Sequence, residues 1–238
     1  LSAFENGGER LFDLTAYAHM TEATFDQMQP LSWPPNRRPF GDLHFSTPDG
    51  RARFVASSAS QRTANPSDFP LLLNTGRLRD QWHTMSRTGL VAVLNQHAPE
   101  PRLDIHPQDA QRLNIASDEL VEVLAPTGKA YYLATLTESV GVGEVFAPIH
   151  WTQAHAGRSV VSALVPRVVD PISGQPQSKQ VAVAISPVVN MLWVRGVLYQ
   201  TDQLMALRSL LNERSTYWCA LPGRAGVLFE SACHGADV

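Results

Sequence analysis

The sequence has very few cysteines, no long apolar run and no excess of positive charge. Two cysteines, Cys219 and Cys233, in 238 residues are too few for a disulfide framework or for an iron–sulfur cluster with four protein ligands, which favours a reducing compartment. No stretch approaches the roughly 18 consecutive apolar residues of a membrane helix, and the amino end lacks the pattern of a signal peptide. A net charge of −3 gives no case for nucleic acid or an anionic membrane as a partner. We therefore expect a cytoplasmic protein in which any anion site is local.

The composition is that of a globular protein. Hydrophobic residues make up 44% of the chain and charged residues 17%, and a chain of this length buries roughly 70 to 75% of its unfolded surface. The sequence begins at Leu1, inside an amphipathic pattern, and ends at Val238 without an obvious stop. We expect it to be a piece of a longer protein whose catalytic parts lie upstream.

The pattern divides the chain into three parts. Residues 66–190 alternate short apolar segments with turns, which predicts a mainly β domain with short helices, built as a small barrel or sandwich. Pro107 suits the first position of a helix over 107–113, which Asn114 is expected to end. Residues 191–238 form a carboxyl-terminal extension with one predicted helix, 201–213. The predicted strands are 69–73, 90–94, 103–105, 120–124, 131–137, 145–146 and 181–185.

Residues 1–65 have a different character, with aromatic side chains at irregular intervals. We expect an irregular α+β segment that packs on the missing upstream domains. A short helix is predicted over 21–28 with Thr21 as its N-cap. The turn signal Pro48-Asp49-Gly50 predicts a small hairpin over 43–55.

The densest polar cluster, residues 74–89, follows the first predicted strand of the barrel. Gly76 lets backbone amides approach an anion, Thr75 and Thr84 offer hydroxyls, and Arg77 offers a planar fork for bidentate contact. These features favour a phosphate-binding loop. The alternative is a solvated loop held by its own hydrogen bonds, because the glycine patterns of the Walker and Rossmann motifs are absent.

Two other polar features allow more than one interpretation. His150 and His155 are residues of a type that often binds metal, but no acidic or cysteine partner stands at ligand spacing. We therefore predict no metal ligand, and no catalytic residue, in this chain. Lys179 follows a turn-rich loop and either reaches a phosphate or carbonyl or is a solvated loop lysine.

The order and spacing of several motifs resemble the carboxyl-terminal molybdopterin-dinucleotide-binding domain of the dimethyl sulfoxide reductase superfamily, and within it most closely the bacterial assimilatory nitrate reductases. The segments before residue 60 resemble the part of those enzymes that precedes this domain, so the resemblance covers nearly the whole chain. The motifs of the domain itself are Asn74-Thr75-Gly76-Arg77, Gln81-Trp82-His83-Thr84-Met85, His106-Pro107-Gln108-Asp109-Ala110, Val145 to Trp151 and Asp170 to Lys179.

The resemblance implies a double-psi β-barrel, as in aspartate decarboxylase, and a cofactor site. It implies that one loop holds the pyrophosphate and guanosine of one of two molybdopterin guanine dinucleotides, with residues Thr75, Gly76, Arg77, Gln81, Trp82, His83 and Thr84. Gln175 and Lys179 would approach the pterin. Where the family pattern has an asparagine, this chain has Ser162, and such a lost hydrogen bond is worth about 0.5 to 1.5 kcal/mol.

The resemblance also implies an activity for the whole protein. The full enzyme would bind molybdenum with two molybdopterin guanine dinucleotides and reduce nitrate to nitrite. A [4Fe-4S] cluster, whose ligands lie upstream, would carry electrons from a donor protein or reductase subunit. This piece alone would be inactive. Two alternatives remain at this point: another superfamily member such as a formate dehydrogenase, or a stand-alone nucleotide-binding barrel without enzymatic activity.

Overall fold

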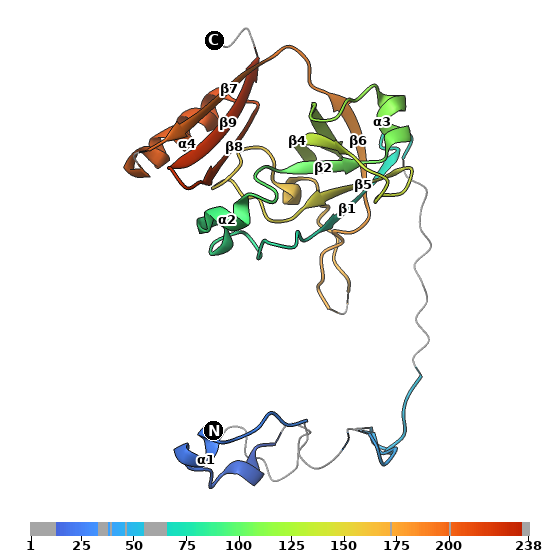
Figure 1. Cartoon of the computed structure of the whole chain (residues 1–238). Helices are drawn as coiled ribbons and strands as arrows, with labels where there is room; N and C mark the ends of the chain where they lie inside the picture. The colour runs from blue at the N-terminus through green and yellow to red at the C-terminus, as the bar shows by residue number, and fades with distance from the viewer. Residues whose placement is uncertain are drawn as a thin grey trace. The chain divides into compact units, whose positions relative to one another are not determined.

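The computed structural model describes residues 13–32, 38, 40–45, 47–54, 66–171, 173–199 and 201–234. The chain divides into two compact units, Leu1–Arg62 and Thr63–Val238 (Figure 1). None of the helices in the described ranges combines the length and hydropathy that a membrane span requires.

The first unit holds short helical elements. A 3-10 turn, η2, spans Thr15–Tyr17, and helix α1 spans Glu22–Asp26. The Thr21 side chain caps α1 by accepting from the backbone N–H of Thr24, as its sequence position predicts. The predicted hairpin is only partly correct. The turn forms, with the Phe45 N–H donating to the Gly50 carbonyl, but no strand flanks it in the described residues, and Val55 lies outside them.

The second unit contains a closed six-stranded barrel with the strand order β1-β5-β2-β4-β3-β6. Two pairs, β1 with β5 and β2 with β4, are parallel, and the other neighbours are antiparallel. The mainly β, double-psi barrel predicted from the sequence is confirmed. Its strands are β1 (Leu71–Gly76), β2 (Arg102–Ile105), β3 (Leu120–Ala125), β4 (Gly128–Leu136), β5 (Glu144–Pro148) and β6 (Val181–Pro187).

The barrel core is filled by aliphatic side chains from every strand, with Tyr132 as its largest member. Alternate residues of β6 point inward, as its burial pattern shows, because successive side chains of a strand face opposite sides. The core is closed by Ala110 of helix α3 and by Val161 and Leu164 of a short 3-10 turn, η4 (Val161–Ala163).

The strand register places the long loops at one end of the barrel. Gly76 at the end of β1 pairs with Pro148 at the end of parallel β5, and Leu73 pairs with Val181 at the start of antiparallel β6. The β3–β4 turn lies at the same end, because Leu124 pairs with Ala184 near the start of β6. We call this the loop end, from which residues 77–101, 126–127 and 149–180 emerge. Every residue predicted to contact the cofactor lies there or on the last residues of β1.

Helix α3 (Pro107–Leu113) lies at the opposite end and matches its predicted bounds. Pro107 occupies its first turn, and the His106 side chain accepts from the Gln108 N–H at 3.2 Å. Asn114 ends the helix in the left-handed region, with φ 55° and ψ 47°. Asparagine tolerates this conformation better than other residues with a Cβ, so its identity stops the helix.

One predicted strand of the barrel is wrong. Residues 90–94 were expected to be extended, but they lie in a 3-10 turn, η3 (Thr88–Leu90), and a one-turn helix, α2 (Ala92–Asn95). A short apolar run has no period that separates a buried strand from a helical segment. The helical conformation is fixed by contacts that the local sequence does not reveal: the Asn95 side chain donates to the carbonyls of Gly89 and Pro222.

The carboxyl-terminal part holds a three-stranded antiparallel sheet in the order β7-β9-β8, which the sequence pattern did not predict. Its strands are β7 (Met191–Leu198), β8 (Tyr217–Pro222) and β9 (Val227–His234). The predicted helix forms as η5 (Thr201–Gln203) and α4 (Leu204–Arg214). One face of the sheet packs on the barrel through Tyr217, Cys219 and Ala232, and the other packs on α4 through Trp218 and Leu211 (Figure 1).

The end of α3 provides a test of the local fold. We predict that Asn114→Ala lowers the free energy of unfolding by about 1 kcal/mol, because alanine is strained in the left-handed conformation. Asn114→Gly should be neutral or slightly stabilising. Urea unfolding of the whole chain measures both, with Gln111→Ala, an exposed position of the same helix, as the control. Equal loss in the alanine and glycine variants would contradict this account.

Candidate functional site

The end of β1 brings two predicted site residues to the loop end. Thr75 is buried, and its hydroxyl donates to the Ser178 carbonyl at 2.8 Å. Gly76 lies against a ring of the neighbouring strand, since a Cβ at this position would lie 2.6 Å from Cε2 of Phe146. The glycine is therefore required by close packing as the chain leaves the barrel.

The loop after β1 is held by its own side chains and by two left-handed residues. His83 and Met85 have φ values of 43° and 60°, and a non-glycine residue in this region costs about 1 to 3 kcal/mol. Met85 is fully buried and anchors the loop. Gln81 is also buried: its Nε2 donates to Asn95 Oδ1 at 3.2 Å, and its Oε1 accepts from the Thr88 hydroxyl at 2.7 Å. Gln81 thus shapes the loop from within.

Other residues of the same loop face solvent. The Arg77 guanidinium lies over the Trp82 ring, 5.2 Å from its centroid, and both side chains are exposed. The rings of Trp82 and His83 meet edge to face at 4.5 Å. Thr84 is exposed beside them. Because Arg77 has no carboxylate partner among the described residues, its charge is available to an anion.

His150, two residues after β5 (Glu144–Pro148), clamps this loop through hydrogen bonds of both its ring nitrogens. Its Nε2 accepts from the Leu78 N–H at 2.7 Å, and its Nδ1 donates to the His83 carbonyl at 2.6 Å. Both contacts form together only in the neutral ring with the proton on Nδ1. Burial lowers the pKa of His150, and the nearby Arg77 charge lowers it further, against the opposing effect of the bond to His83. The fully buried imidazole therefore favours its neutral form.

The loop before β6 meets the end of β1. The Lys179 ammonium donates to the Thr75 carbonyl, so the two residues lie side by side although 104 positions separate them. The Lys179 side chain is exposed, and its ammonium group lies at the carbonyl of Thr75, the residue before Gly76. Two of the predicted cationic residues, Arg77 and Lys179, are thus attached to the same strand end.

Ser162 and Gln175 also lie on loops of the loop end and are exposed. Ser162 belongs to η4, which packs on the β3–β4 turn, where the Thr127 hydroxyl donates to the Leu164 carbonyl at 2.8 Å. Gln175 closes a turn in which its carbonyl accepts from the Asp170 N–H at 2.9 Å. No direct contact between either residue and Arg77 or Lys179 is seen in the described residues.

The two histidines considered as metal ligands, His150 and His155, are both buried. Within the described ranges, no group of three His, Cys, Asp or Glu side chains is placed to hold a metal ion. His150 is satisfied by backbone partners. His155 is buried, and burial lowers its pKa.

Comparison with known proteins identifies the domain. Residues 71–182 match the family described as "Molydopterin dinucleotide binding domain". These residues belong to that family. The chain aligns with a nitrate reductase of Klebsiella oxytoca at 40% identity over 189 residues, an alignment that covers 78% of this chain and 22% of the relative.

Two further relatives extend this result. The assimilatory nitrate reductase catalytic subunit of Bacillus subtilis is 34% identical over 122 residues, covering 51% of this chain and 17% of the relative. An F420-dependent formate dehydrogenase subunit alpha of Methanocaldococcus jannaschii is 31% identical over 142 residues, covering 59% and 20%. The chain therefore spans about a fifth of the length of these relatives. The predicted family is confirmed.

The exposed groups of the dinucleotide-binding domain fit an anionic, aromatic ligand. A pyrophosphate needs cationic or N–H donors, which Arg77 and Lys179 supply. A flat base or pterin needs an aromatic or guanidinium face, which the Arg77–Trp82 pair supplies. Gly76, packed against the Phe146 ring, lets β1 and β5 approach closely just before Arg77. The donor set thus suits a molybdopterin dinucleotide.

Two residues that organise the site were not found from the sequence. His150 was considered only as a metal ligand and rejected as one, and Asn95 directly follows the wrongly predicted strand 90–94 and was given no role. Each acts on a loop residue through the tertiary fold, and His150 is 72 positions from Leu78. No spacing rule links such pairs.

The protonation of His150 gives a pH test of the loop clamp. Because the pKa of His150 in the folded chain lies below the ordinary histidine value of 6.5, the stabilisation is complete above about pH 6.5 and is lost as the pH falls through the folded pKa. We predict that His150→Gln costs about 1 to 3 kcal/mol at pH 7.5, and that this cost shrinks toward pH 5. Urea unfolding at several pH values measures it.

The control for this experiment is His234→Gln, at an exposed strand end. Its difference from the unchanged chain should be small and flat with pH. A cost for His150→Gln that stays constant between pH 7.5 and pH 5 would refute the clamp.

Proposed function

We propose that this chain is the carboxyl-terminal cofactor-binding part of a molybdenum nitrate reductase. The observation that carries the proposal is the gathering of Arg77, Trp82 and Lys179 at one end of the barrel. The similarity to nitrate reductases over most of the chain supports the substrate.

In this proposal the bound group is molybdenum with two molybdopterin guanine dinucleotides, and the barrel contacts one of the nucleotides. Arg77 binds the pyrophosphate as a bidentate donor, and Trp82 gives the guanine a surface for stacking. Lys179, fixed by the Thr75 carbonyl, points its charge toward the phosphate and pterin side. Ser162 and Gln175 add polar contacts from the neighbouring loops.

The cofactor supplies the oxygen-transfer and redox chemistry, in which nitrate is reduced to nitrite by two electrons. The residues of this domain bind, orient and enclose it. The proposed partners are the preceding domains of the same polypeptide, which carry a [4Fe-4S] cluster and the second wall of the site. A donor protein or reductase subunit in the cytoplasm supplies the electrons.

A formate dehydrogenase is the second candidate, because a relative with that name aligns with 59% of the chain. Two assays on the full-length polypeptide distinguish the two activities. We expect nitrate-dependent oxidation of reduced viologen and no formate-dependent dye reduction. The reverse pattern would replace the first proposal with the second.

The role of Arg77 has its own test. Loss of a charged hydrogen bond of this kind costs about 1.5 to 3 kcal/mol, which weakens binding roughly ten- to hundredfold. We predict that Arg77→Ala in the full-length enzyme lowers molybdenum and guanine nucleotide per polypeptide, and lowers nitrate reduction in parallel. Both are measured on the purified protein.

Arg79→Ala is the matched control, since Arg79 is an exposed arginine of the same loop that pairs with Asp80. It should leave cofactor content and activity unchanged. Full cofactor content in the Arg77→Ala enzyme, or an equal loss in both variants, would rule out the proposed contact.

A further inference from the structure

A cavity lies between the barrel and the three-stranded sheet. It has a volume of about 830 Å³ and contains none of the residues assigned to the dinucleotide. We call it the sheet groove. Its barrel side is formed by residues 100, 102, 118–120 and 133, and its sheet side by residues 188–191, 193, 195 and 230.

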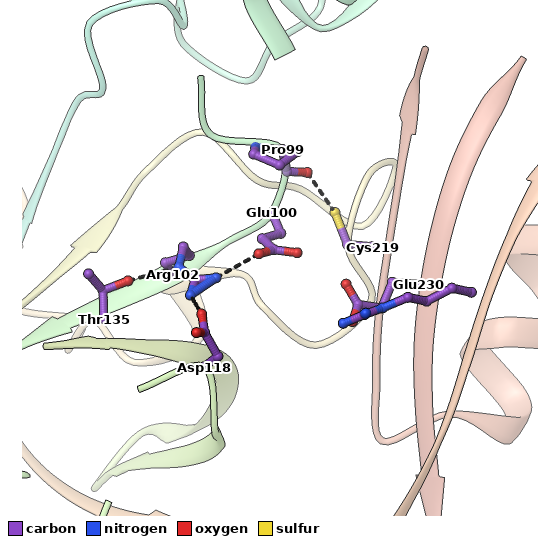
Figure 2. A network of polar contacts seen from close by, with 8 residues as sticks. Pro99, Glu100, Arg102, Asp118, Thr135, Cys219 and Glu230 are labelled. Atoms are coloured by element: carbon purple, nitrogen blue, oxygen red, sulfur yellow. Dashed lines mark hydrogen bonds and ion pairs between the residues drawn. The ribbon is translucent and has the colours of Figure 1, made fainter. Parts of the chain in front are cut away.

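Each side of the sheet groove carries one arginine, whose hydrogen-bond partners all belong to the same side. Arg102 donates to the Glu100 carboxylate at 2.6 Å, to the Thr135 hydroxyl at 2.8 Å and to the Asp118 carboxylate (Figure 2). On the sheet, Arg195 of β7 donates to the Glu230 carboxylate of β9 at 2.6 and 2.9 Å. Neither guanidinium therefore needs a partner from the opposite side.

Glu100 and Glu230 stand on opposite sides of the groove (Figure 2). Burial raises the pKa of Glu230, and the nearby Glu100 raises it further, against the opposing effect of Arg195. Two facing carboxylates repel each other unless a proton or a cation lies between them. Four carboxyl groups and two guanidinium groups line the cavity, so its lining carries excess negative charge.

A buried tyrosine packs against the lining of the groove. Tyr217 is fully buried, and its Oη has no hydrogen bond among the described residues. Both Glu100 and Glu230 act on its ionisation, and burial keeps it protonated by raising its pKa. Its ring packs 5.9 Å from Trp193, which lines the groove. Tyr217 therefore supports Trp193 on the sheet side of the groove.

The sheet also offers a backbone edge beside the groove. In the described residues, β7 pairs only with β9, which leaves the other edge of an eight-residue strand without a ladder. Its side chains Leu192 and Val194 are about half exposed. Unpaired apolar edges of this length are the usual template for an added strand.

We propose that the sheet groove is a docking site for an extended polypeptide segment, which pairs with the free edge of β7 and places one lysine or arginine side chain in the acidic groove. The cation offsets the excess negative charge of the lining, and Trp193 offers an aromatic face to it. A metal ion is a poorer occupant, because no group of three suitable ligands gathers among the described residues.

The test uses the 238-residue chain and labelled eight-residue peptides that alternate threonine and valine. One peptide has a central lysine, a second has glutamate there, and a third has the lysine with alternate backbone amides N-methylated. Fluorescence anisotropy should show the lysine peptide binding about tenfold tighter than the glutamate peptide, since like charges repel the latter. N-methylation should weaken binding by a similar factor, because it removes the strand hydrogen bonds.

The protein variants locate the site. In Glu100→Gln/Glu230→Gln the preference for lysine should fall below about twofold, whereas Glu138→Gln, an exposed glutamate outside the groove, should retain it. The proposal is overturned if no peptide binds, or if the double variant keeps the preference. Equal binding of the N-methylated peptide, or of butylamine in its place, would also overturn it by showing a site for small cations only. The N-methylation result needs no change in the protein, so it holds even if the double variant fails to fold.

Discussion

The pairing of β1 with its two neighbours is the constraint on which the rest of the domain depends. Antiparallel pairing of Leu71–Leu73 with β6 closes the barrel, while parallel pairing with β5 carries β1 to the same end as Pro148. The start of β6 is thereby fixed beside the end of β1. This pairing brings Lys179 to Thr75. Arg77 of the loop after β1 and Lys179 of the loop before β6 therefore lie on the same surface.

The loop end combines a rigid frame with exposed functional groups. Thr75, Gln81, Met85 and His150 are buried and occupied by internal contacts, while Arg77 and its neighbours remain at the surface. The left-handed residues His83 and Met85 store strain that the buried anchor and the histidine clamp offset. Because the buried residues hold the loop and the exposed residues are free to bind, the domain can present donors to a ligand with little rearrangement of the loop.

Local signals in the sequence predicted those parts of the fold that local chemistry decides. Pro107 and Asn114 predicted both ends of α3, and the apolar segment 181–185 predicted most of β6, which spans Val181–Pro187. The carboxyl-terminal sheet was missed, because its strands are stabilised by a barrel face on one side and α4 on the other. Residues 90–94 were misassigned because Asn95 gains its partners from Gly89 and Pro222 only in the folded chain.

The same distinction applies to the site. The loop after the first strand was predicted from its glycine, arginine and hydroxyl groups, and the family resemblance added Lys179. The clamp by His150 and the carboxyl pair of Glu100 and Glu230 join segments more than 60 residues apart. A single sequence contains no pattern for such contacts, so they emerge only from the tertiary structure.

The central claim is that the loop end, and no other surface of the barrel, receives the dinucleotide. Amide hydrogen exchange of the full-length enzyme, with and without its molybdenum cofactor, tests this most directly. The account predicts slower exchange with the cofactor in residues 77–89 and 173–179, and no change at the opposite end in 106–119 and 137–143. Protection at the opposite end, or none at the loop end, would contradict it.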